Sequence, residues 1–386
     1  MLAGCLMTGI AIAASRNTAA QARLAALPAT VPAPADNPTT PERVALGRLL
    51  FWDPVLSGPK DVACATCHHP SLGYADGLDL SIGINGTGLG TERAFAPGGP
   101  ARLVKRNSQT VLNTAFNGLT AAGGVNPGSA PMFWDMRVRT LEAQALEPIK
   151  ALEEMRGETY AEAQAIPAIV SRLNAISEYR RLFARAFGGT QPVNERNLGR
   201  ALAAFQRSLV AANSPFDRYM RGDSSAMTAE QIAGMDRFEA IGCVNCHNGP
   251  MLSDFAPHVL AVPDNSRLAE SDSGLNKTYA FRTPSLRNLG ATAPYMHNGV
   301  FRSLPDVIDF YQRLSRGGGR RGGGGRAPNP HVGRDQIDPL ARQLAMRGRG
   351  QRDLVAFLGA LDDPRFDRTV PAEVPSGLPV GGRLQQ

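Results

Sequence analysis

Two copies of one short pattern constrain this 386-residue chain more than any other feature. The first copy is Cys-Ala-Thr-Cys-His at residues 64–68, and the second is Cys-Val-Asn-Cys-His at residues 243–247. Cys-x-x-Cys-His is the attachment pattern of c-type haem, in which two thioethers hold the porphyrin edge and the histidine binds the iron. We therefore expect a fold built partly around two covalently bound haems c. The residues expected to hold them are Cys64, Cys67, His68, Cys243, Cys246 and His247.

Other kinds of site also use paired cysteines. A structural zinc site brings its Cys pairs within about 15–20 residues of each other, whereas these two pairs lie in different halves of the chain. A thioredoxin-type redox pair belongs to a βαβ context, which this sequence does not indicate. Disulfides suit an exported protein, but they would not explain why a histidine follows both pairs. Two haems remain the best interpretation.

The composition favours helices over sheet, so the predicted fold class is mainly α. Alanine, leucine and arginine dominate, and runs of β-branched residues are sparse. Helices are expected from residue 41, over 141–151, 198–209, 303–314 and 353–361, and from 228 towards the second haem motif. The 41 Gly and 29 Pro indicate long connecting loops.

The chain is expected to divide into two haem domains with extensions at both ends. Residues 1–40 would form a signal-like leader and a Pro-rich linker, 41–222 the first haem domain, 223–366 the second, and 367–386 a disordered tail. The polar stretch 221–226 sets the boundary between the domains. The segments Gly47–Phe51 and Gly234–Phe238 precede the two haem motifs and resemble each other, which suggests duplication of a one-haem unit.

The positive charge does not indicate nucleic-acid binding. The net charge is +7, and part of the excess lies in a Gly/Arg-rich stretch within 316–330. Such runs can bind nucleic acid, but no aromatic residue interleaves these arginines to stack on bases. We interpret the stretch as a flexible, solvated insertion and exclude nucleic acid as a partner.

The first residues suggest export. Residues 1–14 are apolar but shorter than the ~20 residues that span a bilayer. They resemble the core of a signal peptide without its usual positive region, and Ala20-Gln21-Ala22 is a candidate cleavage site. Cys5 lies in a lipoprotein-like box, but too close to Met1 for a complete signal. The expected location is the periplasm.

Three further motifs carry a family resemblance. They are Phe133-Trp-Asp135, Thr283-Pro-Ser-Leu-Arg-Asn288 and Pro294-Tyr-Met-His-Asn-Gly299. Together with the haem motifs, and in the same order, they resemble the bacterial di-haem cytochrome c peroxidase family, which includes the MauG-type enzymes. The resemblance spans roughly 41–366. It implies two mainly α-helical, cytochrome c-like domains packed around an inter-haem calcium ion.

The resemblance also assigns roles near the first haem, where hydrogen peroxide would react on an open face. Trp134 matches the tryptophan that lies between the haems and relays oxidising equivalents. Gln144, Pro148 and Glu154 match the residues of the distal pocket. Glu154 is the candidate general base and acid, since a carboxylate can take one proton from peroxide and return it to the leaving oxygen. The alternative is that Glu154 only decorates a helix surface.

The calcium ligands implied by the resemblance are the Asn107 side chain and the backbone carbonyls of Thr292 and Pro294. Oxygen donors suit a hard cation such as Ca²⁺. Asn107 is otherwise an ordinary turn residue. His297 matches a family histidine that we expect to support the second haem, although a packed core histidine is nearly as good an interpretation.

The sixth ligand of the second haem distinguishes two branches of the family. Cytochrome c peroxidases place a methionine where this chain has Tyr311, and the MauG-type branch has a tyrosine there. A thioether raises the haem potential, whereas an anionic phenolate favours oxidised iron. Tyr311 also fits the apolar face of a helix as a core residue. Met296 would then be an alternative ligand, while Met251 lies too close in sequence to His247 to reach the opposite face.

The leading hypothesis is a di-haem peroxidase of the tyrosine-ligated, MauG-like branch. Its electrons would come from a donor protein, such as a small cytochrome c or a cupredoxin, or from an oxidisable protein substrate. A conventional cytochrome c peroxidase is the nearest alternative. A non-enzymatic electron carrier would need a second ligand on the first haem, and His69 cannot cross the ring because it adjoins His68. The sequence leaves a homodimer open.

Overall fold

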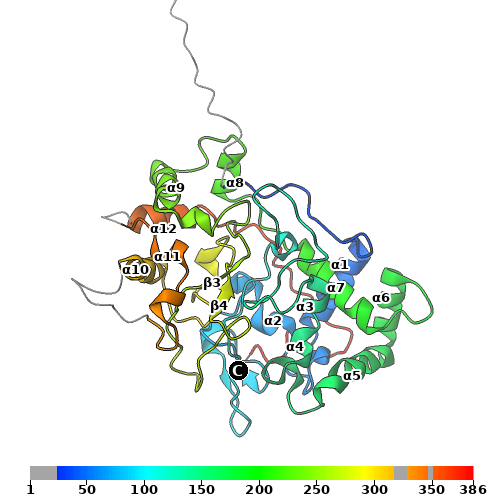
Figure 1. Cartoon of the computed structure of the whole chain (residues 1–386). Coiled ribbons are helices and arrows are strands. Elements are labelled where there is room, and N and C mark those ends of the chain that lie inside the picture. Colours follow the sequence, from blue (N-terminus) through cyan, green and yellow to red (C-terminus); the bar gives the residue numbers. More distant parts are fainter. Residues whose placement is uncertain (1–23, 317–327, 347–350, 386) are drawn as a thin grey trace, which may run out of the picture.

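The computed structural model describes residues 24–316, 328–346 and 351–385 (Figure 1). The described chain is mainly helical, as predicted, and its strands form short antiparallel ribbons, β1 (Gly86–Thr87) with β2 (Ala94–Phe95) and β3 (Pro257–Val259) with β4 (Ala280–Arg282). The helices are α1 (Pro41–Trp52), α2 (Cys64–Cys67), α3 (Leu141–Gln144), α4 (Glu147–Lys150), α5 (Glu162–Ala175), α6 (Ser177–Phe187), α7 (Glu195–Ser208), α8 (Pro215–Met220), α9 (Ala229–Ile241), α10 (Leu304–Ser315), α11 (Pro339–Arg342) and α12 (Gln351–Gly359).

The first haem motif follows a crossing of α1 and α7. The Thr40 side chain caps α1 by accepting a hydrogen bond from the Arg43 N–H. Gly47 lies directly against α7, where a Cβ would overlap the carbonyl oxygen of Ala201. One turn later, the Phe51 ring meets that of Phe205 at 5.1 Å between centroids. The core of this half of the molecule forms around that crossing.

The second haem motif follows a crossing of the same construction, formed by α9 and α12. Thr228 begins α9 in a reciprocal capping box with Gln231. A Cβ at Gly234 would overlap the carbonyl oxygen of Asp353. The Phe238 and Phe357 rings then meet at 5.3 Å. The sequence similarity between 47–51 and 234–238 therefore corresponds to two helix pairs, which lie on opposite sides of the molecule in Figure 1.

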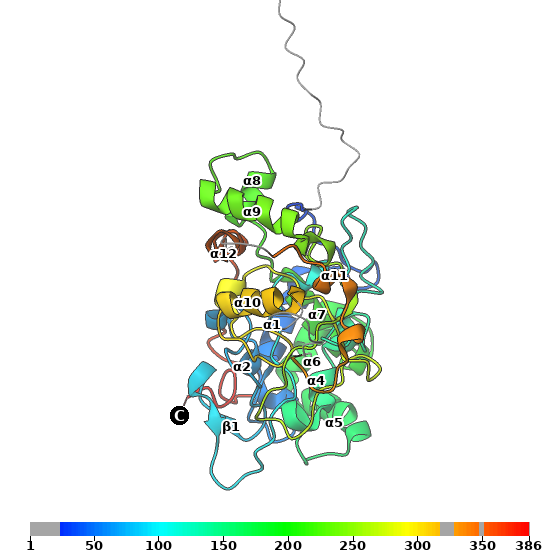
Figure 2. The ribbon, with the colours of Figure 1, turned by 60° about the vertical axis from the view of Figure 1, so that its left-hand side comes forward.

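Residues 367–385 are packed, contrary to the expectation of a disordered tail. Val374 is buried in the core around α1 and α7. The Gly381 N–H donates to the Trp52 carbonyl at 2.7 Å, and the Thr66 hydroxyl donates to the Gly381 carbonyl at 2.9 Å. The tail thus leaves α12 and returns to the first half, where Figure 2 shows the C-terminus near β1. The polar, Pro-rich composition of the tail did not reveal this packing, because backbone groups make most of the contacts.

The Pro-rich segment before α1 was expected to be a linker, but both of its ends pack against the rest of the protein. Leu27 is buried, and its N–H donates to the Asp217 carboxylate at 3.0 Å. The Asn37 amide donates to Glu142 at 2.7 Å. α8 likewise differs from expectation, because Phe216 packs with Phe357 in the second core although it precedes the expected boundary at 222.

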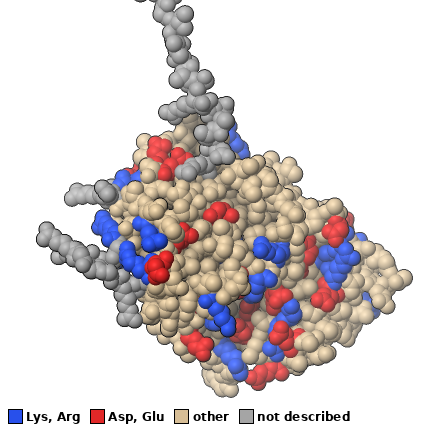
Figure 3. Space-filling model, viewed as in Figure 1, with Lys and Arg blue, Asp and Glu red and all other residues tan. Residues whose placement is uncertain are grey.

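Several expectations fall on residues without described structure. The leader and its Ala20-Gln21-Ala22 site lie outside the described residues, as does most of the 316–330 insertion. No helix among the described residues is long and apolar enough to cross a bilayer. On the face drawn in Figure 3, basic and acidic side chains both occur, and neither sign covers the face alone.

Candidate functional site

One continuous cavity of about 540 Å³ reaches both Cys-x-x-Cys-His motifs. Its wall includes Cys67 and His68 from the first motif and Cys243, Cys246 and His247 from the second. Cys64 lines a small neighbouring cavity together with His68 and Gln144. The two motifs, which are far apart in sequence, therefore face one common space.

Both motif histidines are oriented as iron ligands require. The Nδ1 atom of His68 lies 3.1 Å from the Tyr74 carbonyl oxygen, and Nδ1 of His247 lies 3.0 Å from that of Leu252. A proton on Nδ1 leaves Nε2 as the nitrogen that can bind a metal. Burial lowers the pKa of His68 to about 4 and also lowers that of His247, so both rings are in the neutral form that ligates iron.

The motif cysteines are suited to thioether bonds. None of Cys64, Cys67, Cys243 and Cys246 forms a disulfide. Burial raises the pKa of the Cys64 and Cys243 thiols to about 12, so the free thiols are neutral groups in an apolar setting. Unpaired thiols beside an oriented histidine, facing a large cavity, fit covalently attached haem.

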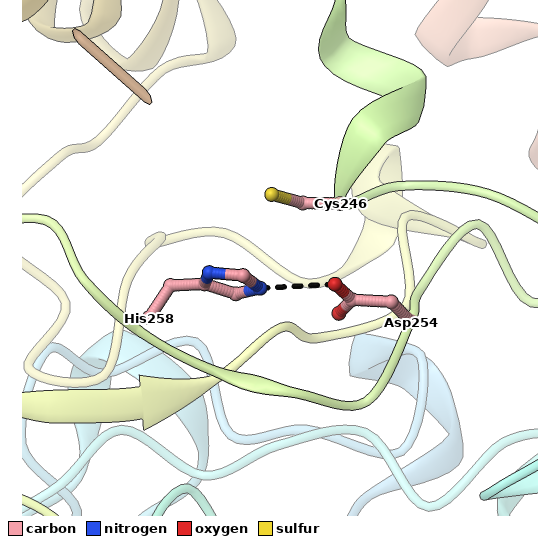
Figure 4. Close-up of side chains that lie close together, drawn as sticks. All are labelled: Cys246, Asp254 and His258. Atoms are coloured by element: carbon pink, nitrogen blue, oxygen red, sulfur yellow. Dashed lines mark hydrogen bonds and ion pairs between the residues drawn. The ribbon is translucent and has the colours of Figure 1, made fainter. Parts of the chain in front are cut away.

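Cys246 also lies close to a carboxylate–imidazole pair. Figure 4 shows it beside Asp254 and His258, whose Oδ2 and Nε2 atoms are 2.9 Å apart. The Nδ1 atom of His258 is 2.6 Å from Asp338, so both ring nitrogens already have partners. Hydrogen bonding to Asp254 raises the pKa of His258 to about 11. Because both ring nitrogens of His258 are taken up by carboxylates, neither is free to bind a metal, and we assign this cluster to the surroundings of the second haem.

Trp134 lies in the wall of the cavity that reaches both motifs. Its Nε1–H donates to the Asn107 carbonyl at 3.1 Å, and the Asn107 N–H donates to the His297 carbonyl at 2.8 Å. The next residue, Ser108, donates its hydroxyl to the Cys67 carbonyl at 2.8 Å and lies 3.3 Å from Nδ1 of His68. A short segment therefore connects Trp134 with the first motif and with the loop of His297.

Glu154 and Gln144 both line the cavity, whereas Pro148 is not part of its wall. Glu154 lies in a π-helical turn, Leu152–Arg156, a conformation found often at functional sites. Gly83 packs against that turn, and a Cβ there would overlap the carbonyl oxygens of Glu153 and Glu154. Burial raises the pKa of Glu154 to about 7, and the charge of Glu153 adds to the effect.

The residues expected to bind calcium belong to the wall of the same cavity. Asn107, Thr292 and Pro294 all line the cavity. The Asn107 side-chain amide donates to the Leu78 carbonyl at 2.8 Å, which leaves its oxygen as an acceptor. The His297 ring nearby is buried and stacks on Phe281 at 3.7 Å between centroids.

Both candidate ligands of the second haem, Tyr311 and Met296, line the cavity, as does Met251. Tyr311 lies on α10, which begins at the Ser303 cap. It packs against the same core as Cys243. Burial raises the pKa of its phenol above the usual value, and nearby Cys246 and Cys243 would raise it further if ionised. The Tyr311 side chain therefore lies in the part of the wall that includes the second motif.

The sequence motifs did not identify two buried polar residues of the wall, Gln206 and Arg282. The Gln206 side-chain oxygen is buried without a hydrogen-bond partner among the described residues. Arg282 directly precedes the 283–288 motif. Its position next to that motif could have drawn attention to Arg282. Nothing in the sequence distinguishes Gln206 from other polar residues of a helix.

Comparisons with known proteins agree with this arrangement. The profile described as di-haem cytochrome c peroxidase matches residues 41–225. The methylamine utilization protein MauG of Methylorubrum extorquens is 37% identical over 89% of this chain and 86% of its own length. A cytochrome-c peroxidase of a Pseudomonas species is 34% identical over 94% of this chain and 92% of its own length. The crystal structure of a MauG-like protein associated with microbial copper homeostasis has a TM-score of 0.68 at 28% identity, covering 87% of this chain and 95% of that one.

Proposed function

Because this chain belongs to the di-haem cytochrome c peroxidase family, we propose that it reduces hydrogen peroxide in the manner of the tyrosine-ligated, MauG-like branch. It is a peroxidase with two c-type haems, as its family membership implies. The observation that carries the proposal is the single cavity that joins both haem motifs and has Glu154, Trp134 and Tyr311 in its wall.

Proton transfer is assigned to Glu154, with Gln144 orienting peroxide or water. Haem bound by Cys64, Cys67 and His68 would supply the redox-active iron with which peroxide reacts. The Glu154 carboxylate takes a proton from peroxide and returns it to the departing oxygen. Its position in the wall and a pKa near neutrality both support this role. Pro148 would act only by shaping the chain between these two residues.

Trp134 is proposed to carry oxidising equivalents between the two sites. Its burial, its place in the cavity wall and its hydrogen bond to Asn107 support that role. The electrons would come from a small redox protein or an oxidisable protein substrate. We propose a periplasmic location, since the apolar residues 1–14 resemble the core of an export signal.

The ligand proposal is tested by spectroscopy of the haem-loaded protein beside Tyr311→Phe. Electron paramagnetic resonance and absorption spectra should show one high-spin and one low-spin haem in the parent protein. Loss of the Tyr311 phenol should change the low-spin signal, because the second haem would lose its sixth ligand. Met296→Leu is the matched control and should leave both signals unchanged. An unchanged Tyr311→Phe spectrum would reject the ligand. Fewer than two haems, or no spectral response to peroxide, would reject the function itself.

We propose a calcium site made by Asn107, Thr292 and Pro294, where carbonyl and amide oxygens would bind a hard cation. Asn107 also accepts the Trp134 hydrogen bond through its backbone, so the ion would stabilise the junction. Dialysis of the protein against a calcium chelator should lower the rate of peroxide reaction, and added Ca²⁺ should restore it. Asn107→Ala should bind less calcium by elemental analysis. Equal calcium content would contradict the site.

A further inference from the structure

Arg282 is a buried arginine at the end of β4 that the proposed mechanism does not use. Only 5% of its surface is exposed, and it lines the cavity shared by the two haem motifs. Its Nε–H donates to the Phe133 carbonyl at 2.9 Å, and Nη2 donates to the Gln109 side chain at 3.2 Å. Its backbone N–H donates to the Trp134 carbonyl at 2.7 Å. These contacts hold the guanidinium at the junction around Trp134.

The charge of Arg282 has no counter-ion in the described part of the protein. The other arginines of the cavity wall are paired: Arg106 with Asp135 and Asp272, Arg137 with Asp135, and Arg287 with Asp217. No carboxylate among the described residues lies within ion-pair distance of Arg282, and its Nη1 has no protein acceptor there. Burial alone lowers its pKa, to about 10, with no contribution from a neighbouring charge.

Such a group requires an anion. An arginine stays protonated in a protein, and a buried cation without a partner is strongly unfavourable. Two of its nitrogens are held by neutral acceptors, which leaves Nη1 available in a residue that lines the cavity. A carboxylate is the group that this planar fork binds best, through two parallel hydrogen bonds. The protein offers no carboxylate there, so the anion must arrive with the bound group.

We propose that Arg282 anchors a haem propionate at the junction of the two haem sites and thereby raises the midpoint potential of that haem. The inference rests on the di-haem function proposed above. Each haem c carries two propionate carboxylates on the side of the ring away from the thioethers. A fixed positive charge beside a propionate favours the reduced iron, which carries one positive charge fewer. Arg282 is thus a positioning residue that acts through the haem.

The test measures both midpoint potentials by spectroelectrochemical titration of the full-length, haem-loaded protein. In Arg282→Gln one potential should fall while the other stays, because one propionate loses its partner. Arg282→Lys keeps the charge and should recover most of the fall. Lys105→Gln, which removes an exposed cation from the same cavity wall, is the matched control and should leave both potentials unchanged. Unchanged potentials in Arg282→Gln, or equal falls of both, would overturn the proposal.

A second measurement covers the case in which Arg282→Gln does not mature. Resonance Raman spectra of Arg282→Lys should show a shifted propionate bending mode for one haem, because a point charge replaces a two-pronged hydrogen bond. An unshifted mode contradicts the anchor. Haem content and the spectral response to peroxide are measured on every variant. A parent protein with two haems and a peroxide response, but no effect at Arg282, rejects only this inference and leaves the proposed function standing.

Discussion

At the scale of single residues, the proposed chemistry depends on how Glu154 is held. Burial is the main cause that raises the pKa of this carboxyl to about 7, and the charge of Glu153 contributes as well. A general base works best when its pKa lies near the working pH. The close packing of Gly83 against the same π-helical turn fixes the backbone from which the side chain extends. The reactivity assigned to one residue thus arises from its neighbours.

Replacing Glu154 by Gln should slow the reaction with peroxide by about 10²- to 10⁴-fold, the usual range for loss of a general acid–base. The amide keeps the size of the side chain but cannot accept the proton. Stopped-flow absorption after mixing with peroxide measures the rate. Haem content should equal that of the parent protein. A rate within a few-fold of the parent would remove Glu154 from the mechanism.

The rate should also depend on pH in a defined direction. The reacting form of Glu154 is the carboxylate, so the rate should rise with pH through about 7 and then level off. In Glu153→Gln the neighbouring negative charge is lost, which lowers the pKa of Glu154 and moves the rise to lower pH. The plateau rate should be retained. A pH profile that does not move would assign the titration to another group.

At the scale of secondary structure elements, two glycines set the distance between paired helices. Gly47 lets α1 approach α7, and Gly234 lets α9 approach α12, each through contact with a backbone carbonyl. The phenylalanine that follows each glycine by one turn packs next to the motif histidine, Phe51 near His68 and Phe238 near His247. The helix crossing therefore positions the residue that lies next to each motif histidine.

Gly234→Ala should lower the free energy of unfolding by about 1–3 kcal/mol, the usual cost of overpacking, because the helices must separate. Equilibrium urea unfolding followed by circular dichroism measures the change. Gly359→Ala, on α12, is the matched control, since a Cβ there meets nothing within 4 Å. It should be neutral or stabilising by up to about 1 kcal/mol. Equal effects at the two positions would disprove the close approach.

At the scale of the whole molecule, the ends of the chain join the two halves. The segment before α1 packs against the second half through Leu27, and the segment after α12 packs against the first half through Val374. The Arg383 N–H donates to the Asp61 carbonyl at 2.9 Å, just before the first haem motif. The segment before α1 thus packs with the second half, and the segment after α12 packs with the first half.

Ending the chain after Thr369 should lower the free energy of unfolding by at least about 3 kcal/mol. The estimate combines loss of the buried Val374 side chain with loss of backbone hydrogen bonds to Trp52 and Asp61. Urea unfolding of the haem-loaded protein provides the measurement. Val370→Ala is the control, because this side chain is 47% exposed and should change stability by no more than about 0.5 kcal/mol. A truncated chain of parental stability would show that the tail contributes nothing.

Local sequence signals predicted the helices best. The caps at Thr40, Thr228 and Ser303 begin helices where expected, because capping involves residues only three positions apart. The haem motifs were recognisable for the same reason. The packing of the tail and of α8 could not be predicted, because Val374 and Phe216 find their partners far away in sequence.

The sequence predicted site residues that a motif identifies. It did not predict which residues tertiary packing brings to the cavity wall. Glu154 and Gln144 do line the cavity, while Pro148, identified by the same spacing, does not. The roles proposed for them are still predictions. Arg282 had to be found from the structure, because its importance lies in the absence of a carboxylate around it among the described residues.

The contact between the tail and the first haem motif has a consequence for biosynthesis. Thr66, inside that motif, donates its hydroxyl to Gly381, which lies 315 residues later in the chain. The peptide that carries the first pair of cysteines therefore cannot make this contact until the chain has been synthesised as far as Gly381. The maturation enzymes that attach haem have that interval in which to reach Cys64 and Cys67 before the tail packs against their motif.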